Sequence, residues 1–83
     1  MTGIVNVGFS NFVVAEKIVA IVGTESAPIR RMMMEARKAG TLVNATQGHK
    51  ARSVILTEKS QIILSALQPE KVARRLESGE QQE

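Results

Sequence analysis

The distribution of apolar and polar residues divides the chain into short strand-like runs and two segments with helical spacing. Residues 4–9, "IVNVGF", alternate so that both valines share a face with Phe9, which predicts a strand. Residues 12–22 are β-branched and apolar apart from one charged pair, which predicts two short strands or one interrupted strand. Further strands are predicted at residues 42–46, 52–57 and 61–67.

Residues 26–39 carry helix signals at both ends. Ser26 is a candidate N-cap, and Pro28 is tolerated in the first turn. Gly40 fits the C-terminal cap. The apolar stripe at helical spacing consists of Ile29, Met32, Met33 and Ala36.

A second helix is predicted between Pro69 and Gly79, in "QPEKVARRLESG". The order of strands, helix, strands, helix is typical of an α+β fold with an antiparallel or mixed sheet and two helices. We expect one domain over residues 1–78, followed by a disordered polar tail at residues 79–83.

Two predicted strands, residues 52–57 and 61–67, are nearly continuous apolar runs, which implies burial on both faces of the sheet. If both helices covered one face only, the other face would remain apolar and exposed. The pattern therefore predicts a homo-oligomer in which another subunit covers that second face.

Composition narrows the function. The net charge is +3, and residues 30–52 hold six cations against one glutamate, a local excess of five, which favours a polyanionic partner. With no cysteine, no aspartate and one histidine, we expect no metal site, no cofactor, no small-molecule substrate and no enzyme activity. No signal peptide or membrane span is visible, so the expected location is the cytoplasm.

The aromatic content favours duplex over single-stranded nucleic acid. Phe9 and Phe12 are the only aromatic residues besides the histidine, and in strand-like stretches both are expected in the core. Single-strand binders stack bases on aromatic platforms, whereas duplex phosphates need only cations. RNA binding through the same cations stays open.

The segment "TQGHKARSVIL" is interpreted as a hairpin turn that leads into a strand. Gly48 relieves the steric limits on the backbone, which allows a tight turn or the close approach of a partner. Its polar donors would point outward, where they suit phosphate oxygens. In the first turn of the first predicted helix, Arg30 and Arg31 oppose the helix dipole, which indicates either an anionic partner or simple solubilisation. The candidate DNA contacts of the turn are His49, Lys50 and Arg52.

Four segments, "NVGFSNFV", "ESAPIRRMM", "ATQGHKARSVI" and "ILSALQPEKVARRL", occur in this order and together resemble the RemA family of bacterial extracellular matrix regulators. The resemblance implies non-enzymatic, nucleoid-associated regulators of transcription and biofilm genes. It also implies ring-shaped homo-oligomers built from dimers that bind double-stranded DNA on the outer rim. It assigns DNA contacts to the turn 48–52 and to Lys17. It also implies that Pro28 is important for the function of the family.

The chain departs from the family pattern, which has arginines where this chain has Lys17, His49 and Lys50. Lysine meets a phosphate as a point charge and lacks the guanidinium fork, and a histidine changes its charge near neutral pH. Two alternatives use the same basic face: an RNA-binding protein, and a structural or protein-interaction module.

Overall fold

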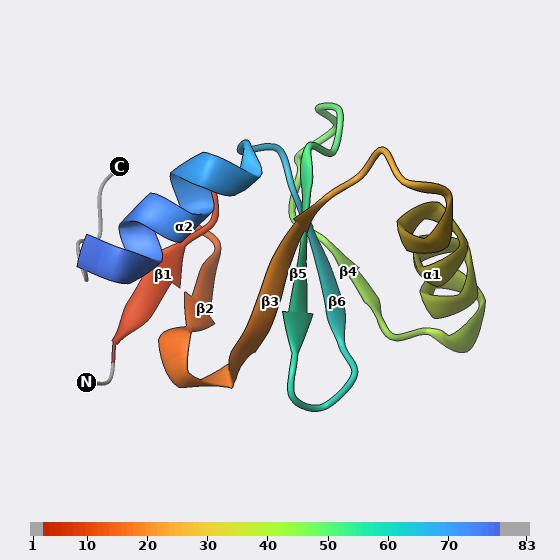
Figure 1. Ribbon diagram of the computed structural model, residues 1–83, viewed down its shortest axis with the longest axis horizontal. Helices are drawn as coiled ribbons and strands as arrows, with labels where there is room; N and C mark the ends of the chain where they lie inside the picture. The colour runs from red at the N-terminus through yellow and green to blue at the C-terminus, as the bar shows by residue number, and fades with distance from the viewer. Residues whose placement is uncertain (1–2, 79–83) are drawn as a thin grey trace.

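The computed structural model describes residues 3–78, which form six strands, a short 3₁₀ helix and two α-helices (Figure 1). The strands are β1 (Ile4–Asn6), β2 (Phe12–Val14), β3 (Ile18–Gly23), β4 (Leu42–Asn44), β5 (Ser53–Thr57) and β6 (Ile62–Ser65). The helices are η1 (Ala15–Lys17), α1 (Ala27–Ala39) and α2 (Pro69–Ser78). The predicted α+β class is confirmed. The predicted tail at residues 79–83 lies outside the described residues, as does Gly79.

The central sheet has the order β3-β5-β6-β4 and is mixed, because β5 is antiparallel to both of its neighbours while β4 and β6 are parallel. Strands β1 and β2 form a separate antiparallel ribbon in which Val5 lies opposite Val13. The charged pair at the predicted break, which includes Lys17, lies in the 3₁₀ turn that joins this ribbon to the sheet.

Each face of the central sheet has its own apolar cluster. On one face, α1 packs Ala36 and its partly buried methionines against Val54 and Leu64. On the other face, α2 and the β1–β2 ribbon bring Val72 and Val5 against Ile55. Figure 1 shows the resulting order of layers, with α1 on one side of the sheet and α2 with the ribbon on the other.

This arrangement corrects the argument for self-association. The continuous apolar strands are buried on both faces, as predicted, since Val54 and Ile55 are both fully buried although they point to opposite faces. However, the chain's own elements cover both faces. The apolar strands therefore need no second subunit, and assembly has to be argued from other surfaces.

Helix α1 has the ends that its sequence predicts. The Ser26 hydroxyl accepts a hydrogen bond from the Ile29 backbone N–H at 3.3 Å, and Gly40 adopts the left-handed conformation with φ of 79°. Pro28 lies in the first turn, where its missing N–H costs nothing.

Two predictions about local structure are wrong. Phe9 is not part of a strand: it lies in the β1–β2 turn with φ of 53° and is 49% exposed, and Phe12 is 45% exposed, so neither is a core residue. The segment around Gly48 is not a hairpin either. Strand β4 pairs with β6 and not with β5, so residues 45–52 cross the end of β6 to connect strands that are not neighbours.

Candidate nucleic-acid interface

Several loops meet at one end of the central sheet. Strands β3, β4 and β6 end there and β5 begins there, so the connections to α1 and α2 lie beside the segment 45–52, called here the basic loop. In Figure 1 this loop projects beyond the sheet, close to the start of α2. Side chains that are far apart in the sequence are thus collected around one loop.

The basic loop is tethered at both ends and turns sharply at its tip. Its two ends bond to β6, through Ala45 N–H to Leu64 O at 3.0 Å and through Arg52 N–H to Ser65 O at 2.8 Å. At the tip, His49 N–H bonds to Thr46 O at 3.0 Å. The two residues between them have positive φ, 54° for Gln47 and 84° for Gly48, a conformation that glycine adopts without steric cost.

The side chains of His49, Lys50 and Arg52 are exposed. Within residues 3–78 the only ion pair joins Lys17 and Glu58, at 3.4 Å. No carboxylate of residues 3–78 therefore forms an ion pair with a cation of the basic loop. Unpaired, exposed cations on a tethered loop are suited to bind phosphate oxygens.

Arg30 joins the basic loop on the α1 side. A groove of about 830 Å³, called here the α1 groove, has three cations and two carboxylates among its lining residues: Arg30, Lys50, Arg52, Glu25 and Glu70. The Arg30 Nε–H points back to Thr24 O at 3.4 Å, which holds the side chain near the loop. Arg31, although exposed, lines neither cavity described here. The structure thus separates the two arginines that the sequence treats as a pair.

Lys17 lies away from the other candidate residues. Its backbone carbonyl accepts from Glu58 N–H at 3.0 Å, next to the end of β5, whereas the basic loop precedes the start of β5. The length of β5 alone separates these two places by roughly 14 Å. One molecule therefore cannot bring Lys17 and the basic loop to the same phosphate.

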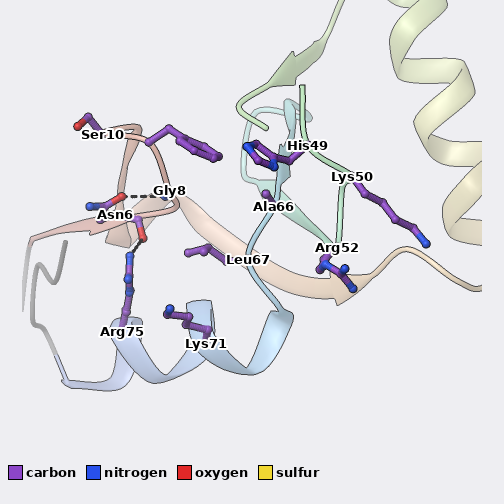
Figure 2. A pocket seen from close by; sticks show the side chains of 11 residues that line it. Asn6, Gly8, Ser10, His49, Lys50, Arg52, Ala66, Leu67, Lys71 and Arg75 are labelled. Atoms are coloured by element: carbon purple, nitrogen blue, oxygen red, sulfur yellow. Dashed lines mark hydrogen bonds between the residues drawn. The ribbon is translucent and has the colours of Figure 1, made fainter. Parts of the chain in front are cut away.

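On the α2 side, the basic loop borders a cavity of about 470 Å³. Figure 2 shows Lys71 and Arg75 projecting from α2 on one side of this cavity, with His49, Lys50 and Arg52 on the other. We call it the α2 cleft. Sequence reasoning missed both α2 residues, although their spacing of four places them on one face of a helix.

Phe9 completes the rim of the α2 cleft. Its ring stacks on the His49 imidazole, with ring centroids 5.0 Å apart and an interplanar angle of 16°. Because Phe9 comes from the β1–β2 turn and His49 from the basic loop, only the folded chain makes this pair. Adjacent Gly8 and Ser10 also have positive φ, 111° and 63°, and the Asn11 side-chain amide donates to Gly8 O at 2.9 Å.

Residues 3–78 contain neither a cluster of metal-binding side chains nor a membrane-spanning helix. No group of three or more His, Cys, Asp or Glu side chains there is placed to hold a metal ion. None of the helices in that range combines the length and apolar character of a membrane span.

Comparison with known proteins agrees with the motifs along the chain. The family model described as "RemA-like: Extracellular matrix regulatory protein A-like" matches residues 4–76. A protein of Moorella thermoacetica is 56% identical over 77 residues, which are 93% of this chain and 85% of that protein. One from Alkaliphilus oremlandii is 56% identical over 75 residues, 90% of this chain and 81% of its own.

A relative from Clostridium botulinum is 51% identical over 80 residues, 96% of this chain and 88% of its own. All three relatives carry the name "Putative regulatory protein". The family match spans both sheets and both helices, including the basic loop and all six predicted DNA contacts. The chain therefore belongs to the RemA-like family.

Proposed function

We propose that this protein is a non-enzymatic regulator that binds double-stranded DNA through the basic loop. The observation that carries the proposal is the cluster of exposed cations at one end of the sheet, none of which pairs with a carboxylate of residues 3–78. Lys50 and Arg52 form its centre, because both line the α1 groove and the α2 cleft. Arg30 extends the surface on the side of α1.

The chemistry of these side chains is suited to phosphates. Each cation that meets a phosphate displaces condensed counterions, so affinity depends steeply on salt concentration. Arg52 can form a two-pronged hydrogen bond with a phosphate or with a guanine edge, whereas Lys50 acts as a point charge. Phosphate contacts therefore dominate the proposed interface, and base readout contributes less.

Assembly into a homo-oligomer makes these weak contacts sufficient for stable binding to DNA. One subunit offers only a few cations, but a ring repeats them in a fixed geometry, so later contacts form intramolecularly. The proposed homo-oligomer also gives Lys17 a role, since a neighbouring subunit can bring its Lys17 to the duplex that the first subunit's basic loop binds. Bending DNA around a rim adds a sequence-dependent elastic cost.

The family match supports a proposal about the biological role. The matching family is described as regulatory for the extracellular matrix, and the relatives are named as regulatory proteins. We accordingly propose that the chain regulates transcription of extracellular matrix and biofilm genes on the nucleoid, in the cytoplasm.

The test is duplex-DNA binding by fluorescence anisotropy at several salt concentrations, with the variant Lys50→Ala/Arg52→Ala. We expect the slope of log affinity against log salt to fall by roughly two for each copy that contacts DNA, because two phosphate contacts disappear. The matched control is Arg37→Ala/Lys38→Ala, which removes the same charge from the exposed last turn of α1.

The comparison between the two double variants decides the outcome. An unchanged slope in the control and a reduced slope in the loop variant support the basic loop as the contact surface. Equal losses in both would indicate a diffuse effect of net charge, and equal retention in both would reject the loop as the DNA contact.

A second candidate function has one specific observation in its favour. The exposed Phe9, stacked on His49, offers an aromatic surface that sequence reasoning had assigned to the core. Base stacking on such a surface is how single-stranded nucleic acids are held. Competition between labelled duplex DNA and unlabelled single-stranded RNA distinguishes the two candidate functions. A protein that prefers duplex DNA stays bound to the labelled duplex when RNA is in excess, whereas a single-strand binder releases it.

A further inference from the structure

Arg75 is a buried cation without a carboxylate partner in the described chain. The residue is 8% exposed, yet the only ion pair within residues 3–78 joins Lys17 and Glu58. Within residues 3–78 its guanidinium donates one hydrogen bond, from an Nη to Asn6 O at 2.8 Å. A guanidinium has five N–H donors and keeps its charge. Because a buried charge without a counter-charge is costly, this position favours an anion.

The surroundings of Arg75 raise the positive charge further. Lys71 lies one helical turn earlier on α2, and Lys50 and Arg52 of the basic loop also line the α2 cleft. Figure 2 shows that the Lys50 amino group extends away from α2, so Arg52 is the loop cation on the side of Lys71 and Arg75. No aspartate or glutamate of the described chain lines the cavity. Four cations line one cavity that has no acidic side chain in its lining, which makes a site for more than one anionic group.

The wall of the α2 cleft also offers a planar surface. Phe9 and His49 stack at its rim, and Leu67 adds an apolar side chain. Phe9 reaches this place only because the turn before β2 accepts positive φ at Gly8, Phe9 and Ser10 in succession, a rare conformation that is concentrated at functional sites.

We propose that the α2 cleft binds a free nucleotide, with its phosphates among Arg75, Lys71 and Arg52 and its base against the Phe9–His49 pair. A cavity of about 470 Å³ is within the range of small-molecule sites. The proposal does not depend on DNA binding. If both activities exist, the shared Arg52 makes the nucleotide and DNA compete, so the nucleotide acts as an effector.

The test measures the melting temperature of the full chain without DNA or divalent cations, at matched ionic strength. The probes are ATP, inorganic triphosphate and adenosine. Ligands that bind only the folded state raise the melting temperature. We expect the largest rise with ATP, a smaller rise with triphosphate and none with adenosine. Base stacking should give ATP at least about a fivefold lower dissociation constant than triphosphate.

Two variants of neighbouring arginines locate the site. Arg75→Met keeps a similar volume and removes the buried charge, so we expect the response to ATP to disappear. The substitution also removes the hydrogen bond to Asn6 O, so the melting temperature without ligand should fall, and each response is measured from the variant's own melting temperature. Arg74→Met, the matched control, changes an exposed residue of the same helix that does not line the cleft, and it should keep the full response. If Arg75→Met does not fold, Lys71→Ala provides the same test from an exposed position.

Other results would overturn the proposal. It is wrong if ATP and triphosphate leave the melting temperature unchanged, or if Arg75→Met responds like Arg74→Met. It is also wrong if Phe9→Ala preserves the preference for ATP over triphosphate, because the base then binds elsewhere.

A nucleotide within a DNA strand has the same phosphate and base as a free nucleotide. A final measurement therefore distinguishes binding of a free nucleotide from binding of DNA. Duplex affinity is measured for Arg75→Met and Arg74→Met. Equal duplex affinity of the two variants, with the ATP response lost only in Arg75→Met, supports a free nucleotide. Loss of duplex affinity in Arg75→Met, with no response of the native chain to ATP, overturns the proposal and assigns the cleft to the DNA backbone.

Discussion

At the scale of single residues, backbone conformation places the candidate side chains. Gly48 and Gln47 bend the basic loop, and Phe9 and Ser10 bend the turn that faces it, all with positive φ. For a residue with a β-carbon this conformation costs roughly 1–2 kcal/mol. The hydrogen bonds from the Asn11 amide to Gly8 O and Phe9 O hold the second turn in place against this cost.

Gly48→Ala isolates the backbone contribution of the basic loop. A β-carbon at Gly48 would meet no atom within 4 Å, so only its φ of 84° opposes the substitution. We expect the free energy of unfolding to fall by about 1 kcal/mol, since backbone strain outweighs the reduced entropy of the unfolded chain. Thermal unfolding followed by circular dichroism measures the effect.

The control for this change is Gly3→Ala, which also has no atom within 4 Å and for which no positive φ is found. It should not lower the melting temperature and should raise it slightly, because alanine reduces the entropy of the unfolded chain without backbone strain. If both substitutions have equal effects, the left-handed conformation of Gly48 is not the source of the loss.

At the scale of elements, α1 depends on a short signal at its start. The Ser26 hydroxyl accepts a hydrogen bond from one of the free N–H groups of the first turn. The ring of Pro28 fixes its own φ at a value that suits the helix. In the same turn, the Arg30 side chain donates to Thr24 O and lines the α1 groove, whereas Arg31 lines neither cavity.

Pro28→Ala tests whether this proline acts only through the helix start. The unfolded chain gains conformational entropy, so we expect a loss of about 0.4–1 kcal/mol in stability. In a domain of this size the melting temperature should fall by roughly 2–8 °C. Duplex affinity below the transition should be unchanged. A loss of affinity without a lower melting temperature would show instead that Pro28 belongs to a contact surface.

At the scale of the whole molecule, the exposed apolar residues mark the surface that remains for assembly. The central strands are covered on both faces, and the edge strands expose one valine each, Val19 on β3 and Val43 on β4. The outer face of the β1–β2 ribbon exposes Ile4, Phe12 and Val14 at 43–47%. Ile4 lies directly opposite Val14, so these side chains form a continuous patch. Patches of this kind are typical of protein–protein contacts.

Val14→Lys tests this patch as a subunit interface of the proposed homo-oligomer. The side chain is already half exposed, so the fold should tolerate the lysine, while a charge in an apolar interface is costly. We expect the molar mass measured by light scattering after size exclusion to decrease. Met34→Lys is the matched control, because Met34 is 57% exposed on α1, and it should leave the mass unchanged. Equal masses for all three proteins would exclude the ribbon as the interface.

The sequence by itself determined the features that depend on neighbouring residues. Apolar periodicity, Ser26 and Gly40 located α1, and the broken apolar run located the 3₁₀ turn at Lys17. Their signals lie within a few residues of each other, and local hydrogen bonds satisfy them. The positive charge near Gly48 could also be predicted from the sequence, because the charge of a side chain depends on its residue type and not on which residues pack against it.

The tertiary structure alone decided which distant residues meet. Strand β4 could pair with β5 or with β6 on pattern alone, and the choice of β6 turned a predicted hairpin into a crossing loop. The same packing brought Phe9 to His49 and Lys71 and Arg75 to the basic loop, while it left Lys17 at the far end of β5. These contacts join segments tens of residues apart, and only the burial of two apolar clusters on opposite faces of one sheet fixes them.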